Sequence, residues 1–157
     1  MNYLQQQDAI CRVVIADAKG STPREAGAEM VIFSDGFEGT IGGGTLEYEA
    51  IAMARRLLIA AKEKGFYRHW QSFALGPSLG QCCGGMVTVL FEAFAPMILP
   101  ELQKYDAQHI AAWRHDDDAA TLPVPTDAVT APKYEASPKR LYLPEPKPRR
   151  AFYLYGA

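Results

Sequence analysis

Two adjacent cysteines in a glycine-rich turn are the residues of this chain best suited to chemistry. The turn reads Gly80-Gln81-Cys82-Cys83-Gly84-Gly85. Glycine has no Cβ, so a ligand can approach the backbone beside these thiols closely. A thiolate held there could bind a soft metal or accept sulfur, and nearby backbone amides would lower its pKa. The alternative is that one thiol, Cys82 rather than Cys83, is buried as a small apolar residue.

A second set of polar groups lies in residues 19–27. Ser21 and Thr22 offer hydroxyls, and Pro23 fixes the turn. Arg24 supplies a planar fork of five donors that suits a phosphate or a carboxylate. The alternative is an ordinary polar surface turn with a solvated arginine.

A third glycine loop, residues 39–47, runs into a predicted helix. Its three consecutive glycines are Gly42, Gly43 and Gly44. Uncovered N–H groups at a helix N-terminus attract anions. The alternative is a tight strand-to-helix turn in which Glu47 completes the cap. Glu47 would repel a phosphate placed too near it, so it could instead hold a ligand's hydrogen-bond donors or orient Arg24.

Hydrophobic periodicity predicts the elements that must position these loops. Apolar and β-branched runs predict strands at residues 11–16, 30–33, 66–75 and 86–94. Asp35-Gly36 predicts a type I′ hairpin turn and a returning third strand. Helical periodicity predicts a helix over residues 45–64, which Gly65 ends. The expected fold is α/β of the α+β kind, with a small mixed or antiparallel sheet, one long helix and glycine-rich loops. Cys11, inside the first strand, is expected in the core.

The composition changes near residue 95. Twelve of the thirteen glycines lie between Gly20 and Gly85, whereas nine of the eleven prolines lie at Pro96 or later. We therefore divide the chain into a first domain (1–95), a Pro-rich connector (96–150) with short strands around residues 109–113 and 140–143, and a final apolar strand (151–157). Asp116 to Asp118 is expected to be a solvated turn rather than a metal site.

Composition excludes several classes of protein. The chain has 157 residues, enough for one ordinary domain, and its 16 basic and 18 acidic residues form no basic stripe for nucleic acid. No apolar stretch approaches the roughly 20 residues that span a bilayer. Three cysteines, an odd number, and the lack of a secretory leader indicate free thiols in the cytoplasm.

Taken together, the three loops resemble the XdhC/CoxI type of xanthine dehydrogenase accessory factor. Their motifs follow in order, with the family's spacing, over roughly residues 8–95. The resemblance implies a chaperone without turnover of its own. Such a protein binds the molybdenum cofactor (molybdopterin), supports its sulfuration and passes it to a xanthine dehydrogenase-type molybdoenzyme. It also implies a second, Rossmann-like domain, of which residues 151–157 look like the first strand cut off in its motif.

The resemblance assigns roles to residues of all three loops. The expected cofactor-binding residues are Ser21, Thr22, Arg24, Gly42, Gly43, Gly44, Glu47, Gln81, Cys83, Gly84 and Gly85. Cys83, directly before the Gly-Gly pair, matches the family's most constant thiol and is the expected metal contact. A cysteine desulfurase is a second expected partner, and the resemblance together with the unpaired final strand favours a homodimer. Two other functions stay open: a cysteine-dependent sulfur-transfer or redox enzyme, and a protein-interaction module whose glycine loops are only tight turns.

Overall fold

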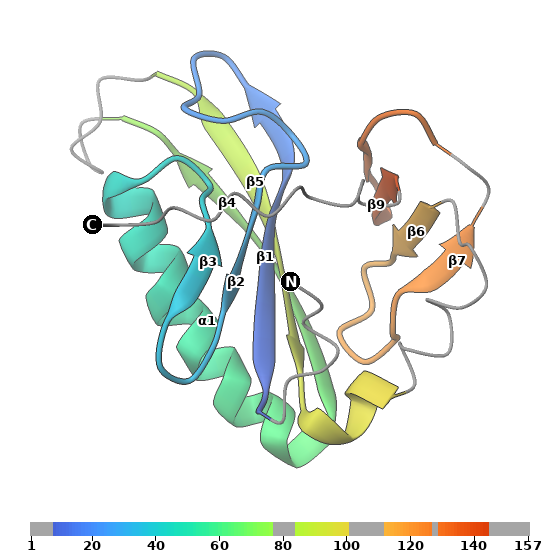
Figure 1. Ribbon diagram of the computed structural model, residues 1–157. Coiled ribbons are helices and arrows are strands. Elements are labelled where there is room, and N and C mark those ends of the chain that lie inside the picture. Colours follow the sequence, from blue (N-terminus) through green and yellow to red (C-terminus); the bar gives the residue numbers. More distant parts are fainter. Residues whose placement is uncertain (1–7, 77–83, 101–111, 127–128, 145–157) are drawn as a thin grey trace, which may run out of the picture.

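A five-stranded antiparallel sheet forms the centre of the molecule (Figure 1). The computed structural model describes residues 8–76, 84–100, 112–126 and 129–144. The strand order is β3-β2-β1-β5-β4, and every neighbouring pair is antiparallel. The strands are β1 (Ile10–Lys19), β2 (Glu29–Ile32), β3 (Phe37–Gly39), β4 (Phe66–Ala74) and β5 (Met86–Phe94). We call this the main sheet, and it confirms the predicted fold class and strand positions.

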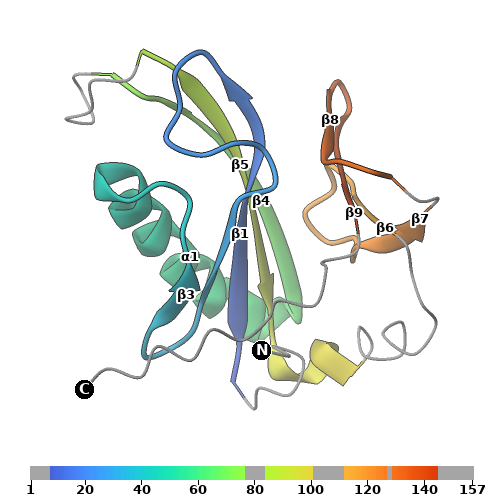
Figure 2. The ribbon, with the colours of Figure 1, turned by 45° about the horizontal axis from the view of Figure 1, so that its top comes forward.

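One long helix, α1 (Gly44–Lys64), covers one face of the main sheet (Figure 2). Its buried residues recur at the predicted helical spacing: Leu46, Ala50, Ala54, Leu57, Leu58 and Ala61. They pack on alternate residues of the strands, among them Val13, Val89 and Phe91. Gly65 ends the helix as predicted, with φ 83°, and its N–H donates to the Ala61 carbonyl at 2.7 Å. Among the described residues, no helix combines the length and the apolar composition that a membrane span requires.

The opposite face of the main sheet carries a second antiparallel sheet of four short strands, which we call the small sheet. Its order is β7-β6-β9-β8, with β6 (Ala112–His115), β7 (Val124–Thr126), β8 (Lys133–Ala136) and β9 (Lys139–Pro144). The sequence predicted short strands near β6 and β9, but not β7 or β8. Prolines do not exclude strands here, because Pro125 lies in the edge strand β7 and Pro132 directly precedes β8. A 3₁₀ turn, η3 (Pro96–Ile98), follows the main sheet.

The hairpin between β2 and β3 forms as predicted, but the predicted type I′ turn is wrong. The register pairs Ile32 with Phe37, so four residues make the connection. A type I′ turn needs positive φ at both central residues, and Gly36 does not have it. Phe33 is buried beside Val31 and belongs to this wider connection, in which its N–H donates to the Gly36 carbonyl at 2.8 Å.

Candidate functional site

The first and third glycine loops meet backbone to backbone. A Cβ at Gly85 would lie 2.3 Å from the carbonyl oxygen of Ser21 and 2.7 Å from that of Lys19, and one at Gly20 would lie 3.2 Å from the Gly85 Cα. No side chain fits at Gly85, so only glycine allows this close approach. Gly85 is fixed from the other side too, because its carbonyl accepts a hydrogen bond from the Leu75 N–H at 2.8 Å.

The first and second loops also touch. A Cβ at Gly42 would lie 2.5 Å from Cγ of Pro23 and 3.6 Å from Cγ of Arg24, and Gly42 has φ 127°. The loop after β1, the entry to α1 and the start of β5 therefore lie together at one end of the main sheet (Figure 1). The structure brings together the predicted site residues that it describes, whereas Gln81 and Cys83 lie outside the described residues.

Glu47 fills the turn before α1 with its own carboxylate. Its Oε1 accepts hydrogen bonds from the amides of Ile41 at 3.0 Å, Gly42 at 3.2 Å and Gly43 at 2.9 Å, and from the Thr40 hydroxyl. Partial burial opposes ionisation, but these hydrogen bonds outweigh it and lower the pKa of Glu47. The ionised Glu47 carboxylate thus already accepts the hydrogen bonds of the Gly42 and Gly43 amides, to which an external anion would otherwise bind. A ligand phosphate at those amides would have to displace it.

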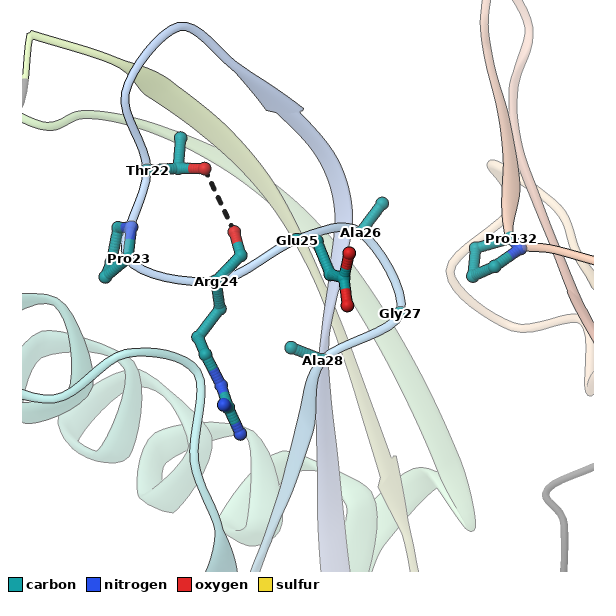
Figure 3. Close-up of a pocket in the computed structure, with 8 residues that line it drawn as sticks. All are labelled: Thr22, Pro23, Arg24, Glu25, Ala26, Gly27, Ala28 and Pro132. Atoms are coloured by element: carbon teal, nitrogen blue, oxygen red, sulfur yellow. Dashed lines mark hydrogen bonds between the residues drawn. The ribbon is translucent and has the colours of Figure 1, made fainter.

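An open pocket of about 590 Å³ lies beside the first loop (Figure 3). Its lining residues are Thr22, Pro23, Arg24, Glu25, Ala26, Gly27, Ala28 and Pro132. The Thr22 hydroxyl donates to the Arg24 carbonyl at 3.0 Å, which holds the turn. The Arg24 side chain is exposed and points away from Pro132 in Figure 3. Sequence analysis missed the wall that Pro132 contributes from the small sheet.

A buried cluster of charged side chains joins the two sheets, and sequence analysis missed it as well. Arg68, Glu92 and His115 are 2%, 1% and 1% exposed. Oε1 of Glu92 accepts a hydrogen bond from Nε of Arg68 at 2.8 Å and lies 2.9 Å from Nδ1 of His115. Nη1 of Arg68 donates to the carbonyls of Asp116 at 2.9 Å and Asp118 at 3.0 Å. Arg68 therefore binds both the Glu92 carboxylate of the main sheet and the backbone that follows β6.

The environment decides which groups of this cluster carry charge. Burial would raise the pKa of Glu92, but His115, Arg68 and Arg12 together hold that pKa at about 2. Burial lowers the pKa of His115 and outweighs the opposing effect of Glu92. At neutral pH the carboxylate is therefore ionised and the imidazole neutral, and Nδ1–H of His115 donates to Glu92.

Two other predictions concern Cys11 and the acidic run 116–118. Cys11 is fully buried, as expected, and burial raises the pKa of its thiol. The acidic run forms a turn in which Asp118 accepts a hydrogen bond from the Ala120 N–H at 2.8 Å, and Asp116 pairs with Arg114 and Arg140. Within the described ranges, no group of three or more His, Cys, Asp or Glu side chains could hold a metal ion. The predicted metal contact at Cys83 lies outside those ranges.

Comparison with known proteins matches part of the chain to a family. Residues 3–69 are similar to the model of the XdhC and CoxI family. The matched segment includes the first two glycine loops and ends within β4, so residues 80–85 follow it.

Two similar proteins extend the comparison beyond the XdhC and CoxI segment. The uncharacterized protein YqeB of Escherichia coli (strain K12) is 32% identical over 97 residues, which are 61% of this chain and 17% of YqeB. The crystal structure of a xanthine dehydrogenase from Bacillus halodurans matches with a TM-score of 0.60 at 21% identity, over 80% of this chain and 40% of that chain. At that identity the likeness concerns the fold. The chain spans less than half the length of either protein.

Proposed function

We propose that this chain is an accessory protein that binds the molybdenum cofactor and supports xanthine dehydrogenase-type molybdenum hydroxylases in the cytoplasm. The observation that carries the proposal is the convergence of the glycine loops at one end of the main sheet. Gly85 packs on Ser21, and Gly42 packs on Pro23, in contacts that only glycine permits. Loops that served only as local turns would not need to approach one another so closely.

The donor set of these loops suits the chemistry of the cofactor. Molybdopterin carries a phosphate, a hydrogen-bonding ring and, when loaded, a sulfur-ligated metal. The exposed guanidinium of Arg24 suits the phosphate. A Cβ at Gly43 or Gly84 would meet no described atom within 4 Å, so a flat ring can approach the backbone there. Because Glu47 already takes the amides of Gly42 and Gly43, we assign the phosphate to Arg24 rather than to those amides.

The thiol of Cys83 completes the proposed site on sequence grounds. Cys83 lies in the third motif, two residues after Gln81 and directly before Gly84. The next residue, Gly85, is packed against the first loop. A thiolate is a suitable ligand for molybdenum and a suitable contact for sulfur during sulfuration. We propose Cys83 for this role.

Cofactor retention tests the proposal. We would purify the chain after exposure to molybdenum cofactor and measure molybdenum and oxidised pterin per chain. Arg24→Ala should reduce retention by roughly tenfold or more, because a hydrogen bond to a charged group contributes about 1.5–3 kcal/mol. Cys83→Ser should also reduce retention, because a hydroxyl is a poorer ligand than a thiolate for a soft metal. Arg55→Ala, at an exposed site on α1, and Cys82→Ser are the matched controls and should retain the cofactor. Retention by Arg24→Ala and Cys83→Ser equal to that of the unmodified chain would refute the site.

A persulfide assay separates this proposal from a sulfur-transfer enzyme. The chain would be exposed to a cysteine desulfurase and its substrate, and Cys83 would be analysed by mass spectrometry. Tight cofactor binding without a persulfide on Cys83 supports the accessory role. A persulfide that passes onward to an acceptor, in a chain that binds no cofactor, supports the enzyme.

A further inference from the structure

The small sheet is held on the main sheet by few apolar contacts. Among the described residues, the buried apolar cluster between them has Val14, Ala16 and Leu90 facing Leu141 and Leu143, with partly buried Trp70 and Tyr134 beside it. Leu122, between β6 and β7, adds a partly buried contact to a second cluster. By comparison, the cluster between the main sheet and α1 contains nineteen buried residues in the same described part of the chain. Because apolar burial is the main stabilising contribution to such packing, the small sheet is the more weakly attached layer.

Polar atoms in this interface are incompletely satisfied. Glu92 Oε2, His115 Nε2 and Trp70 Nε1 are buried and have no hydrogen-bond partner within the described part of the chain. A buried polar atom without a partner destabilises the docked arrangement, and it regains hydrogen bonds to water on release. The interface therefore contains groups that favour its separation.

The charges around His115 are balanced only while its imidazole is neutral. Among the described residues, the charged groups that act on His115 are Glu92 of β5, Arg12 of β1 and Arg68 of β4, and Arg12 pairs with Glu29 of β2. Tyr134 of β8 lies farther along the interface, near Asp17 and Asp117. Arg12 pairs with Glu29 at 2.7 Å, Nη2 of Arg68 lies 2.7 Å from Glu92, and burial raises the pKa of Tyr134, which stays neutral. A proton on His115 would add a second buried positive charge beside Glu92, whose single carboxylate already pairs with Arg68.

The small sheet is also part of the pocket beside the first loop. Pro132, which precedes β8, lies against Gly27, where a Cβ would come within 2.6 Å of the proline Cγ. Gly27 is fixed to the main sheet, because its N–H donates to the Ile15 carbonyl at 2.7 Å. Movement of the small sheet would therefore separate Pro132 from Gly27 and remove one wall of the pocket.

We propose that the small sheet is a detachable wall of this pocket, released from the main sheet as a unit when His115 takes up a proton. The cluster of Arg68, Glu92 and His115, which we call the latch, holds the small sheet on the main sheet. Burial lowers the pKa of His115, so the latch contributes stability above pH 6.5 and loses it as the pH falls below that value. Glu92 stays ionised over the same range. That the pocket receives the cofactor rests on the proposed function, whereas the detachment itself does not.

The two tryptophans of the chain report on this interface. Trp70 of β4 packs on Tyr134 of β8, with ring centroids 5.8 Å apart. Trp113 of β6 pairs with Leu143, which is buried against the main sheet. Release would expose both indoles to water and shift their emission to longer wavelength. The far-UV circular dichroism of α1 would not change.

The experiment follows both signals from pH 7.5 to 4.5 in the unmodified chain without cofactor. We expect one red shift of the emission below pH 6.5 at constant far-UV signal. His115→Gln keeps an amide donor for Glu92 but takes up no proton, so it should abolish the shift. His69→Gln is the matched control, because His69 lies beside Phe91 on the α1 side of β4, and it should leave the shift unchanged.

Three results would overturn the inference: no red shift, a red shift that coincides with loss of the far-UV signal, or an unchanged transition in His115→Gln. If that variant does not fold, proton NMR of the unmodified chain gives the answer. The His115 ring must then titrate together with the emission change, and independent titration would also overturn the inference. The transition should persist in Arg24→Ala, so failure of cofactor binding and failure of the latch remain distinguishable.

Discussion

Glu92→Gln should destabilise the fold far more than any exposed carboxylate would. The substitution keeps the shape of the side chain and an oxygen acceptor, but it removes the charge opposite Arg68, which is 2% exposed. Arg68 would keep its hydrogen bonds to the carbonyls of Asp116 and Asp118. It would nevertheless become a buried cation without its counterion, an arrangement that costs about 3–5 kcal/mol.

The pKa of Glu92 supports the same direction. That pKa is lowered in the fold, where Arg68 pairs with the ionised carboxylate. We therefore expect a loss of about 3–5 kcal/mol in the free energy of unfolding. For a domain whose total stability is roughly 5–15 kcal/mol, the variant should still fold.

Urea unfolding followed by circular dichroism measures this loss of stability. Its dependence on pH shows whether the charge of Glu92 causes it. Because the folded pKa of Glu92 is depressed, its contribution in the intact cluster is lost as the pH falls from 4.5 towards 2, and release of the small sheet below pH 6.5 begins that loss earlier. The stability difference between the unmodified chain and Glu92→Gln should therefore shrink as the pH falls below 6.5. Glu38→Gln, at an exposed position of β3, is the matched control and should change stability by less than about 0.5 kcal/mol. A loss below about 1 kcal/mol for Glu92→Gln at pH 7 would refute the reasoning.

Three further predictions concern the glycine loops and the core. Gly85→Ala should destabilise the chain by about 1–3 kcal/mol in urea unfolding, because its Cβ would lie 2.3 Å from the Ser21 carbonyl oxygen. Gly84→Ala is the control and should be nearly neutral, because its Cβ would meet no described atom within 4 Å. Equal effects of the two substitutions would contradict the loop contact. Glu47→Ala removes the acceptor of three backbone amides and should lower the thermal midpoint by an amount equivalent to about 1–2 kcal/mol, while Glu49→Ala should not. Cys11, fully buried with a raised thiol pKa, should resist a thiol reagent until the chain unfolds, and rapid labelling in the native protein would show that its strand opens.

The main sheet and α1 could be predicted because their signals are local. Strand alternation, helical spacing and Gly65 lie within single elements, and each survives in the structure. The small sheet could not be predicted in full, because its strands have only three to six residues and prolines lie within β7 and at the end of β9. For strands so short, pairing with neighbours decides the conformation more than local propensity does.

The charged cluster escaped sequence analysis for a related reason. Arg68 and Glu92 are 24 residues apart and meet only because β4 pairs with β5, and His115 arrives from another sheet. One signal was available, since Arg12, Arg68 and Glu92 each place a charge inside an apolar strand. The register aligns these three charges in one row across β1, β5 and β4. The closeness of the three glycine loops likewise depends on which strands are neighbours.

Equilibrium titration of molybdenum cofactor into the full chain tests the central claim most directly. The unmodified chain and Arg55→Ala should bind with the same dissociation constant, whereas Arg24→Ala should bind at least roughly tenfold more weakly. Arg24→Lys should lie between them, because lysine supplies a charge without the planar fork. Equal dissociation constants for all four proteins, or no binding by the unmodified chain, would contradict a cofactor site at the converging glycine loops.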